Sequence, residues 1–198
     1  MQVPGLLQEY KGCLATRKFD EAKKINKEVN YFITNEINTT GDELLYFAVD
    51  LLHNAHRFEE SIPVYFAAAS MFKKNGDLMR MSRCVGGTVD GLPGMHEANE
   101  GMIARDVTMK DVVKRHVISL MRDIKNQMLE VTSVSEGDKC RCMSWVLEYI
   151  AMSEELVDDD VAAHEAWEES RVWELEEESE SSEIEEEPGK AKRRRFTW

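Results

Sequence analysis

Three segments in the first hundred residues repeat one short pattern at nearly constant spacing. The pattern is a large apolar residue, then any residue, then Glu, then a small residue. It begins at Phe19, Phe58 and Met95, so the steps are 39 and 37 residues. Self-similarity at this period predicts a stack of helical hairpins, because each two-helix unit buries its apolar side against the next unit.

The positions of the repeat suit two antiparallel helices joined by a tight turn. We expect the apolar residue to begin the second helix of each unit and to fill the hairpin. The small residue that follows, Ala22, Ser61 or Ala98, would let the first helix approach closely. Alanines 67–69 lie on the same predicted helix as Ser61, and we expect them to contact helices on more than one side.

The first helix of each unit is predicted by apolar residues at helical spacing. Residues 39–43 and 74–77 contain the breaks between units, and residues 91–94 form the turn inside the third unit. The apolar residues are Leu6, Leu7, Tyr10, Cys13 and Leu14 in the first unit, and Leu45, Ala48, Val49 and Leu52 in the second.

Residues 6–105 resemble the tetratricopeptide family. The second unit carries the family's pattern of small and aromatic residues, and residues 65–77 are also similar to hairpins of the soluble NSF-attachment proteins. The first unit departs from the pattern, with Tyr10 at a small position and Asn26 at an aromatic one, so an irregular helical bundle is the alternative. The matching residues are Val49, Phe58, Ser61, Tyr65 and Ala68.

Two further helices are predicted between residues 108 and 156. Thr108 and Asp111 resemble a capping box. Apolar residues then recur every three or four positions, namely Val113, Val117, Leu120, Ile124, Met128 and Val131. Residues 142–156 should form a second helix with an inward face of Met143, Val146, Leu147 and Ile150. We therefore expect an all-α fold of about eight helices, arranged as stacked antiparallel hairpins in a domain of residues 1–157.

The chain changes character at residue 158, where a strongly charged tail begins. Residues 153–187 hold seventeen acidic residues and one basic residue, whereas residues 188–198 hold five basic residues and no acidic one. Low hydrophobicity with high charge disfavours a packed core. We therefore expect residues 158–198 to be largely disordered, with some helix at the start.

The acidic run permits two functions. It either keeps the protein in solution or attracts a basic partner such as a histone. Trp167 and Trp173 are candidate contact residues, because tryptophan often anchors protein interfaces. Alternatively, both side chains pack back on the helical body. Ser182, with Glu185 three residues later, resembles a phosphorylation site for an acidophilic kinase.

The basic cluster resembles the short signal that importin-α reads. This resemblance implies a protein that moves between cytoplasm and nucleus. Two alternatives stay open: pairing of the cluster with the acidic run, and weak binding of nucleic acid, where Phe196 or Trp198 could stack on a base. The residues of the cluster are Lys190, Lys192, Arg193, Arg194 and Arg195.

No motif for catalysis, for a cofactor or for a metal occurs in the sequence. His53 and His56 have no third ligand at a suitable spacing, and Cys140 and Cys142 form a single pair where zinc sites usually have two. The four cysteines are expected to be thiols. We also expect no secretory signal and no membrane-spanning helix.

We therefore expect a non-enzymatic adaptor or scaffold that binds protein partners. The tetratricopeptide resemblance implies that the first helix of each unit lines the binding face, although Asp50 departs from the clamp that some family members use for chaperone C-termini. The implied contact residues are Lys11, Tyr46, Asp50, His53 and Asn54. A chaperone for basic proteins and a nucleic-acid-associated regulator, possibly viral, are the alternatives.

Overall fold

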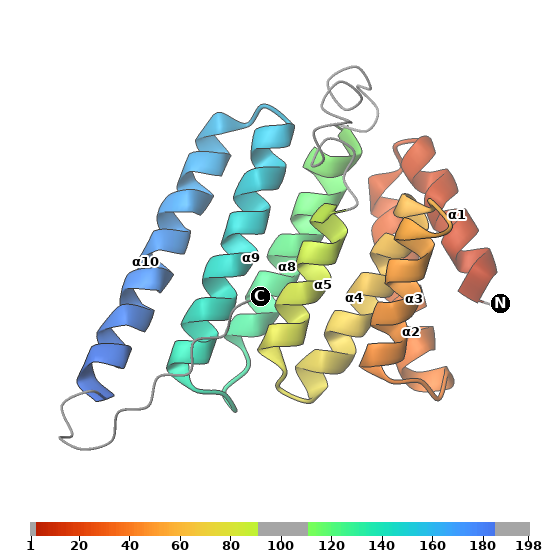
Figure 1. Ribbon diagram of the computed structural model, residues 1–198. Coiled ribbons are helices and arrows are strands. Elements are labelled where there is room, and N and C mark those ends of the chain that lie inside the picture. The colour runs from red at the N-terminus through yellow and green to blue at the C-terminus, as the bar shows by residue number, and fades with distance from the viewer. Residues whose placement is uncertain (1–2, 91–110, 185–198) are drawn as a thin grey trace.

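The computed structural model describes residues 3–90 and 111–184, with side chains through residue 176. Every regular element in these ranges is a helix, which confirms the all-α prediction. Figure 1 shows the helices side by side, from α1 at one end to α10 at the other. The elements are α1 (Val3–Ala15), α2 (Phe19–Glu36), α3 (Gly41–His53), α4 (Phe58–Lys74), α5 (Leu78–Asp90), η2 (Val113–Val117), α8 (Ile118–Leu129), α9 (Glu136–Leu156) and α10 (Asp160–Ile184).

The first two predicted hairpins are present. Helix α2 begins at Phe19 and α4 begins at Phe58, the two positions that the repeat assigned to the start of a second helix. Ala22 and Ser61 are fully buried, as close packing requires. The second helix of the third unit, with Met95 and Ala98, lies outside the described residues.

Tight turns join four of the helix pairs, and each contains one residue with positive φ. These residues are Arg17 (φ 58°), His56 (φ 52°), Gly76 (φ 69°) and Asp158 (φ 58°). A residue in the left-handed region commonly ends a helix because it reverses the chain while satisfying the last carbonyls. His56 therefore lies in the turn after α3 and shares no helix with His53.

Helix α4 is the centre of the molecule. It packs against α1, α2, α3, α5 and α8. Alanines 67–69 are buried, since several helices approach this one helix from different sides. Small side chains allow this close approach, whereas a large one would force the neighbouring helices apart. The sequence prediction for these alanines is confirmed.

Two consecutive glycines of α5 allow close packing against two different helices, α4 and α9. A Cβ atom on Gly87 would lie 2.6 Å from Cε1 of Tyr65 in α4. A Cβ atom on Gly86 would lie 2.8 Å from Cζ of Tyr149 in α9. Both tyrosine rings therefore occupy space that any larger residue would need, and α5 connects the N-terminal hairpins to the C-terminal helices.

In the helix described from residue 111, a π-helical turn, η2, precedes α8. Its predicted apolar face is buried, from Val113 through Met128 to Val131. The π-helical turn was not expected from the sequence. It contains His116, which is fully buried and whose Nε2 lies 2.7 Å from the hydroxyl oxygen of Tyr10 in α1. This hydrogen bond joins residues 106 positions apart.

Residues 160–184 form one continuous helix, α10, which is longer than the partial helix expected at the start of a largely disordered tail. Ala163, Ala166 and Ser170 are buried against α9, and the hydroxyl oxygens of Ser144 and Ser170 lie 3.0 Å apart. Small residues let the two helices approach closely, and this packing offsets the entropy of ordering. Residues 185–198 lie outside the described part of the chain.

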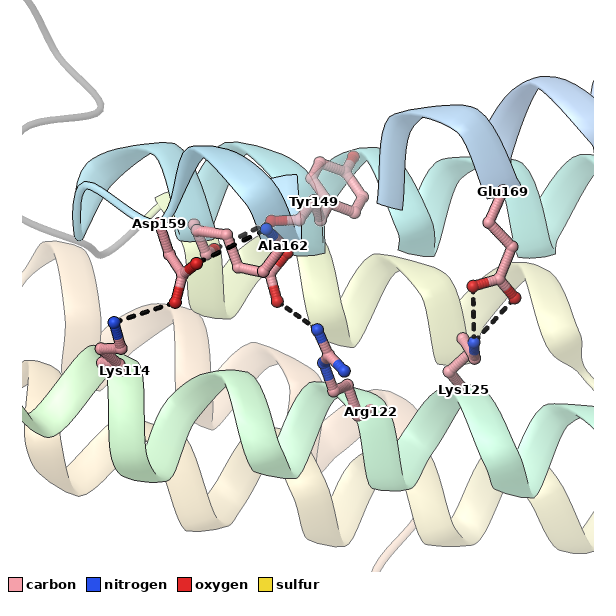
Figure 2. A network of polar contacts seen from close by, with 9 residues as sticks. Lys114, Arg122, Lys125, Tyr149, Asp159, Ala162 and Glu169 are labelled. Atoms are coloured by element: carbon pink, nitrogen blue, oxygen red, sulfur yellow. Dashed lines mark hydrogen bonds and ion pairs between the residues drawn. The ribbon is translucent and has the colours of Figure 1, made fainter. Parts of the chain in front are cut away.

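Basic residues of η2 and α8 neutralise part of the acidic charge around α10. Lys125 Nζ lies 2.8 Å from a carboxylate oxygen of Glu169, and Lys114 Nζ lies 2.9 Å from one of Asp159 (Figure 2). Arg122 pairs with Glu154, whose side chain is buried. The two lysine contacts connect α10 and the turn before it to α8 and η2, whereas the Arg122–Glu154 pair joins α8 to α9. The composition of the tail did not reveal the lysine contacts.

One residue that matches the tetratricopeptide pattern lies at an exposed position. Val49 was matched to a small position of the family's pattern, and its side chain is 38% exposed. Ala48 is fully buried and takes the contact position instead. Tyr10, the large residue at the corresponding position in the first unit, is fully buried.

Candidate protein-interaction surface

Large apolar side chains are exposed on α2 and α3. Tyr46 is 76% exposed and Phe47 is 44% exposed, both on α3, and Tyr31 and Ile37 are exposed on or just after α2. We call Tyr31, Ile37, Tyr46 and Phe47 the α2–α3 surface. They remain outside because the opposite side of α3, with Leu44, Ala48, Leu51 and Leu52, already packs toward α4.

A groove of about 310 Å³ lies beside Phe47, between the beginning of α1, the end of α2 and α3. Its walls are mostly apolar. Burying apolar side chains of a partner here would remove them from water without leaving polar groups unpaired. The lining residues are Val3, Pro4, Leu7, Ile33, Ile37, Thr39, Glu43, Leu44, Phe47, Leu51 and Arg57.

The charged residues that line the groove are held by neighbouring groups. The Glu43 carboxylate accepts hydrogen bonds from the backbone N–H of Thr40 at 2.8 Å and from the hydroxyl of Thr39 at 3.0 Å. These bonds lower the pKa of Glu43. Arg57 donates from Nε to Glu60 at 3.0 Å, and hydrogen bonding to Glu60 raises the pKa of Arg57. Because Glu60 partly neutralises Arg57, Glu43 is the acidic group that the groove offers to a partner.

The predicted contact residues of α3 are exposed, and none of them lines this groove. Tyr46, Asp50 and His53 follow one another at helical spacing, and Asn54 donates to Oδ1 of Asp50 at 2.7 Å. Lys11 lies apart from them on α1, with Nζ 3.9 Å from Glu59 of α4. Three of the five residues therefore lie on α3, and Asn54 follows directly as its C-cap residue.

Sequence reasoning missed Phe47 and the groove residues Ile33 and Ile37. A signal for Phe47 was present: residues 44–49 are all apolar. A helix packed on one side cannot bury six consecutive side chains, since successive residues point in directions 100° apart. Some of them had to face solvent. The groove had no sequence signal, because it depends on how α1, α2 and α3 meet.

The two tail tryptophans are half-buried and pack against the hydrophobic core. The indole N–H of Trp167 donates to Glu155 at 2.8 Å. These positions favour the alternative that both side chains pack back on the helical body. Ser182 lies in α10, in the part whose side chains are not described, and the basic cluster from Lys190 to Arg195 lies beyond the described residues.

The described residues contain no group of three or more His, Cys, Asp or Glu side chains placed to hold a metal ion. Cys84, Cys140 and Cys142 are buried, and Cys13 is half-buried. Burial raises the pKa of the Cys142 thiol to about 11, so it is protonated near neutral pH. In residues 3–90 and 111–184, no helix is both long and apolar enough to cross a bilayer.

Comparisons of the chain with protein-family models, with curated proteins and with solved structures found no match. The tetratricopeptide resemblance therefore stays a prediction from the residues quoted above.

Proposed function

We propose that this protein is a non-enzymatic adaptor that binds a protein partner through the α2–α3 surface and the groove beside it. One observation carries the proposal: Tyr46 and Phe47 are exposed on a helix that borders an apolar groove. Contiguous exposed apolar area is costly in water and commonly marks an interface. Aromatic side chains are also frequent among the residues that dominate binding energy.

The shape and charge of the surface indicate the chemistry of the partner. A groove between helices accepts apolar side chains that recur at helical spacing on a partner helix. Glu43 lines the groove beside its apolar residues, whereas Arg57, which also lines it, is already paired with Glu60. The partner segment is therefore an amphipathic helix with at least one basic residue at its edge.

The nuclear part of the proposal is supported by the sequence of the tail. Lys190, Lys192 and the three arginines that follow fit the short basic signal read by importin-α. We therefore place the adaptor in both the nucleus and the cytoplasm. Replacement of Arg193, Arg194 and Arg195 by alanine should shift a fluorescent fusion toward the cytoplasm, and an unchanged distribution would contradict nuclear import through this signal.

The binding surface is tested by affinity capture with tagged full-length protein. Phe47→Ser removes the aromatic group beside the groove, and Leu129→Ser is the matched control, because Leu129 is similarly exposed on α8. We expect Phe47→Ser to reduce capture of at least one partner by about tenfold or more, as for a residue that dominates an interface. Equal capture by both variants would overturn the assignment. Circular dichroism of each variant checks that the fold is intact.

A further inference from the structure

The outward side of α10 carries apolar residues that no described helix covers. Val161 is 72% exposed, Val172 is 54% exposed and Leu175 is 65% exposed. At 100° per residue these three residues project to one side of the helix, opposite the buried Ala166 and Ser170. Helix α10 is also the last described helix in the row (Figure 1), so this side faces away from the other helices.

Acidic residues share this side of the helix. Glu165 and Glu168 fall between Val161 and Val172, and Glu168 pairs with Arg171 at 2.9 Å. We call Val161, Glu165, Glu168, Val172 and Leu175 the α10 outer face. Residues 160–187 contain Arg171 as their one basic residue, so the surroundings are strongly negative. A second copy of the same face is a poor occupant, since like charges brought together cost several kcal/mol.

The C-terminal segment of the chain has the complementary chemistry. Residues 190–198 contain five basic residues and no acidic one, and they end with Phe196 and Trp198. Basic groups suit the glutamates of the α10 outer face, and aromatic rings suit its apolar residues. Both kinds of contact are therefore available to one short peptide.

The length of the chain permits this contact within one molecule. Five residues separate Ile184, the last described residue, from Lys190, and they include the dipeptide Pro188–Gly189, which favours a turn. Nine extended residues span roughly 30 Å, which equals about twenty residues of helix at 1.5 Å each. A segment that reverses after the helix can thus run back along α10 as far as Val172 and Glu165.

Tethering favours this occupant over a free basic partner. A segment joined to its site by a short flexible linker experiences an effective concentration in the millimolar range. We infer that residues 190–198 bind to the α10 outer face of the same molecule. The bound segment withholds its basic cluster from importin-α or nucleic acid until it is released. This consequence rests on the proposed nuclear entry, whereas the binding itself does not.

The experiment compares the tail in the full-length protein with the free peptide of residues 188–198. Backbone amide chemical shifts of residues 190–198, measured by nitrogen-15 NMR, report binding without any partner protein. We expect the shifts in the full-length protein to differ from those of the peptide. They should stay unchanged on tenfold dilution, because an intramolecular contact does not depend on concentration.

Two variants with matched chemistry locate the contact. Val172→Lys with Leu175→Lys places positive charge on the α10 outer face. Val49→Lys with Leu129→Lys makes the same change at two exposed apolar residues outside α10. The first variant should return the tail amides to the shifts of the free peptide, and the second should leave them as in the wild type.

Three results would overturn the inference. The first is that the tail amides of the wild type have the same shifts as the free peptide. The second is that both variants have the same effect on the tail amides. The third is that the shift differences disappear on dilution, which would mean that the tail contacts another molecule. If the α10 variant does not fold, replacement of Arg193, Arg194 and Arg195 by alanine tests the same contact from the tail. It should shift the amides of Glu168, Val172 and Leu175, and no shift there would contradict the inference. None of these measurements depends on the α2–α3 surface.

Discussion

His116 is buried among α1, α2 and η2. Its imidazole is hydrogen-bonded to Tyr10 and lies beside the ring of Phe19, with centroids 6.3 Å apart and planes at 22°. Burial, followed by the positive charge of Lys23, lowers the pKa of His116 to about 4. The folded protein therefore holds this histidine neutral at physiological pH.

Acid should destabilise the protein through this one residue. A histidine in the unfolded chain has a pKa near 6.5. Below that pH the unfolded chain therefore binds a proton that the folded protein does not bind until the pH approaches 4. The stabilisation is complete above pH 6.5 and is lost as pH falls toward 4. We expect about 2 to 3 kcal/mol of the unfolding free energy to disappear between pH 7 and pH 4.5 on this account.

Urea unfolding at the two pH values measures this loss. His116→Gln is the comparison protein, because Gln can accept a hydrogen bond from Tyr10 but does not titrate. The wild type should lose more stability on acidification than the variant by the stated amount. Equal losses would show that His116 does not carry the effect.

The close packing of helix α4 at the centre of the stack depends on small side chains. Ala68 is fully buried, and α4 contacts helices on several sides. We expect Ala68→Leu to lower the unfolding free energy by ~1–3 kcal/mol or more, because a larger side chain overpacks the site. Ala15→Leu, at an exposed position of α1, is the control and should change stability little. An unchanged melting temperature for Ala68→Leu would argue against close contact there.

The sequence predicted elements best where residues must be buried. The starts of α2 and α4 followed from the repeat, and the inward faces of α8 and α9 followed from apolar periodicity. The π-helical turn around His116 could not be predicted, because its residues have the same apolar composition as an ordinary α-helical turn. The exposure of Val49 was also missed, since Ala48 and Val49 are both small enough for a contact position.

The extent of helix α10 was underestimated from the sequence, because amino-acid composition averages over both sides of a helix. Its acidic residues dominate the sequence, whereas Ala163, Ala166 and Ser170 on the other side make the contact with α9. Lys125 and Lys114 lie more than thirty positions away from their partners Glu169 and Asp159. The charges of residues that are neighbours in the sequence do not indicate such long-range pairs. The same limitation applies to the groove beside Phe47, whose walls come from three helices and the segments that join them.

At the scale of the whole molecule, α10 covers the C-terminal end of the helix stack. Removal of residues 158–198 would expose Leu147 and Ile150 of α9 and would leave Arg122 and Lys125 without α10 beside them. We expect this truncation to lower the melting temperature by about 10 °C or to cause aggregation, because several kcal/mol of packing are lost.

Truncation after Ile184 is the matched control. It keeps α10 and removes only the residues that follow, so its melting temperature should lie within a few degrees of the full-length value. Differential scanning calorimetry of both proteins separates the two cases. If the protein that lacks residues 158–198 has the same melting temperature as the full-length protein, then the packing of α10 on α9 contributes no stability.

The binding of a protein partner at Phe47 is the central claim, and site-specific photo-cross-linking tests it most directly. A benzophenone amino acid replaces Phe47 in one full-length protein and Leu129 in another, and both are irradiated in cell extract. We predict a protein adduct at position 47 that is absent at position 129 and that excess wild-type protein prevents, whereas excess Phe47→Ser protein does not. Identical adducts at both positions, or equal competition by both proteins, would contradict the claim.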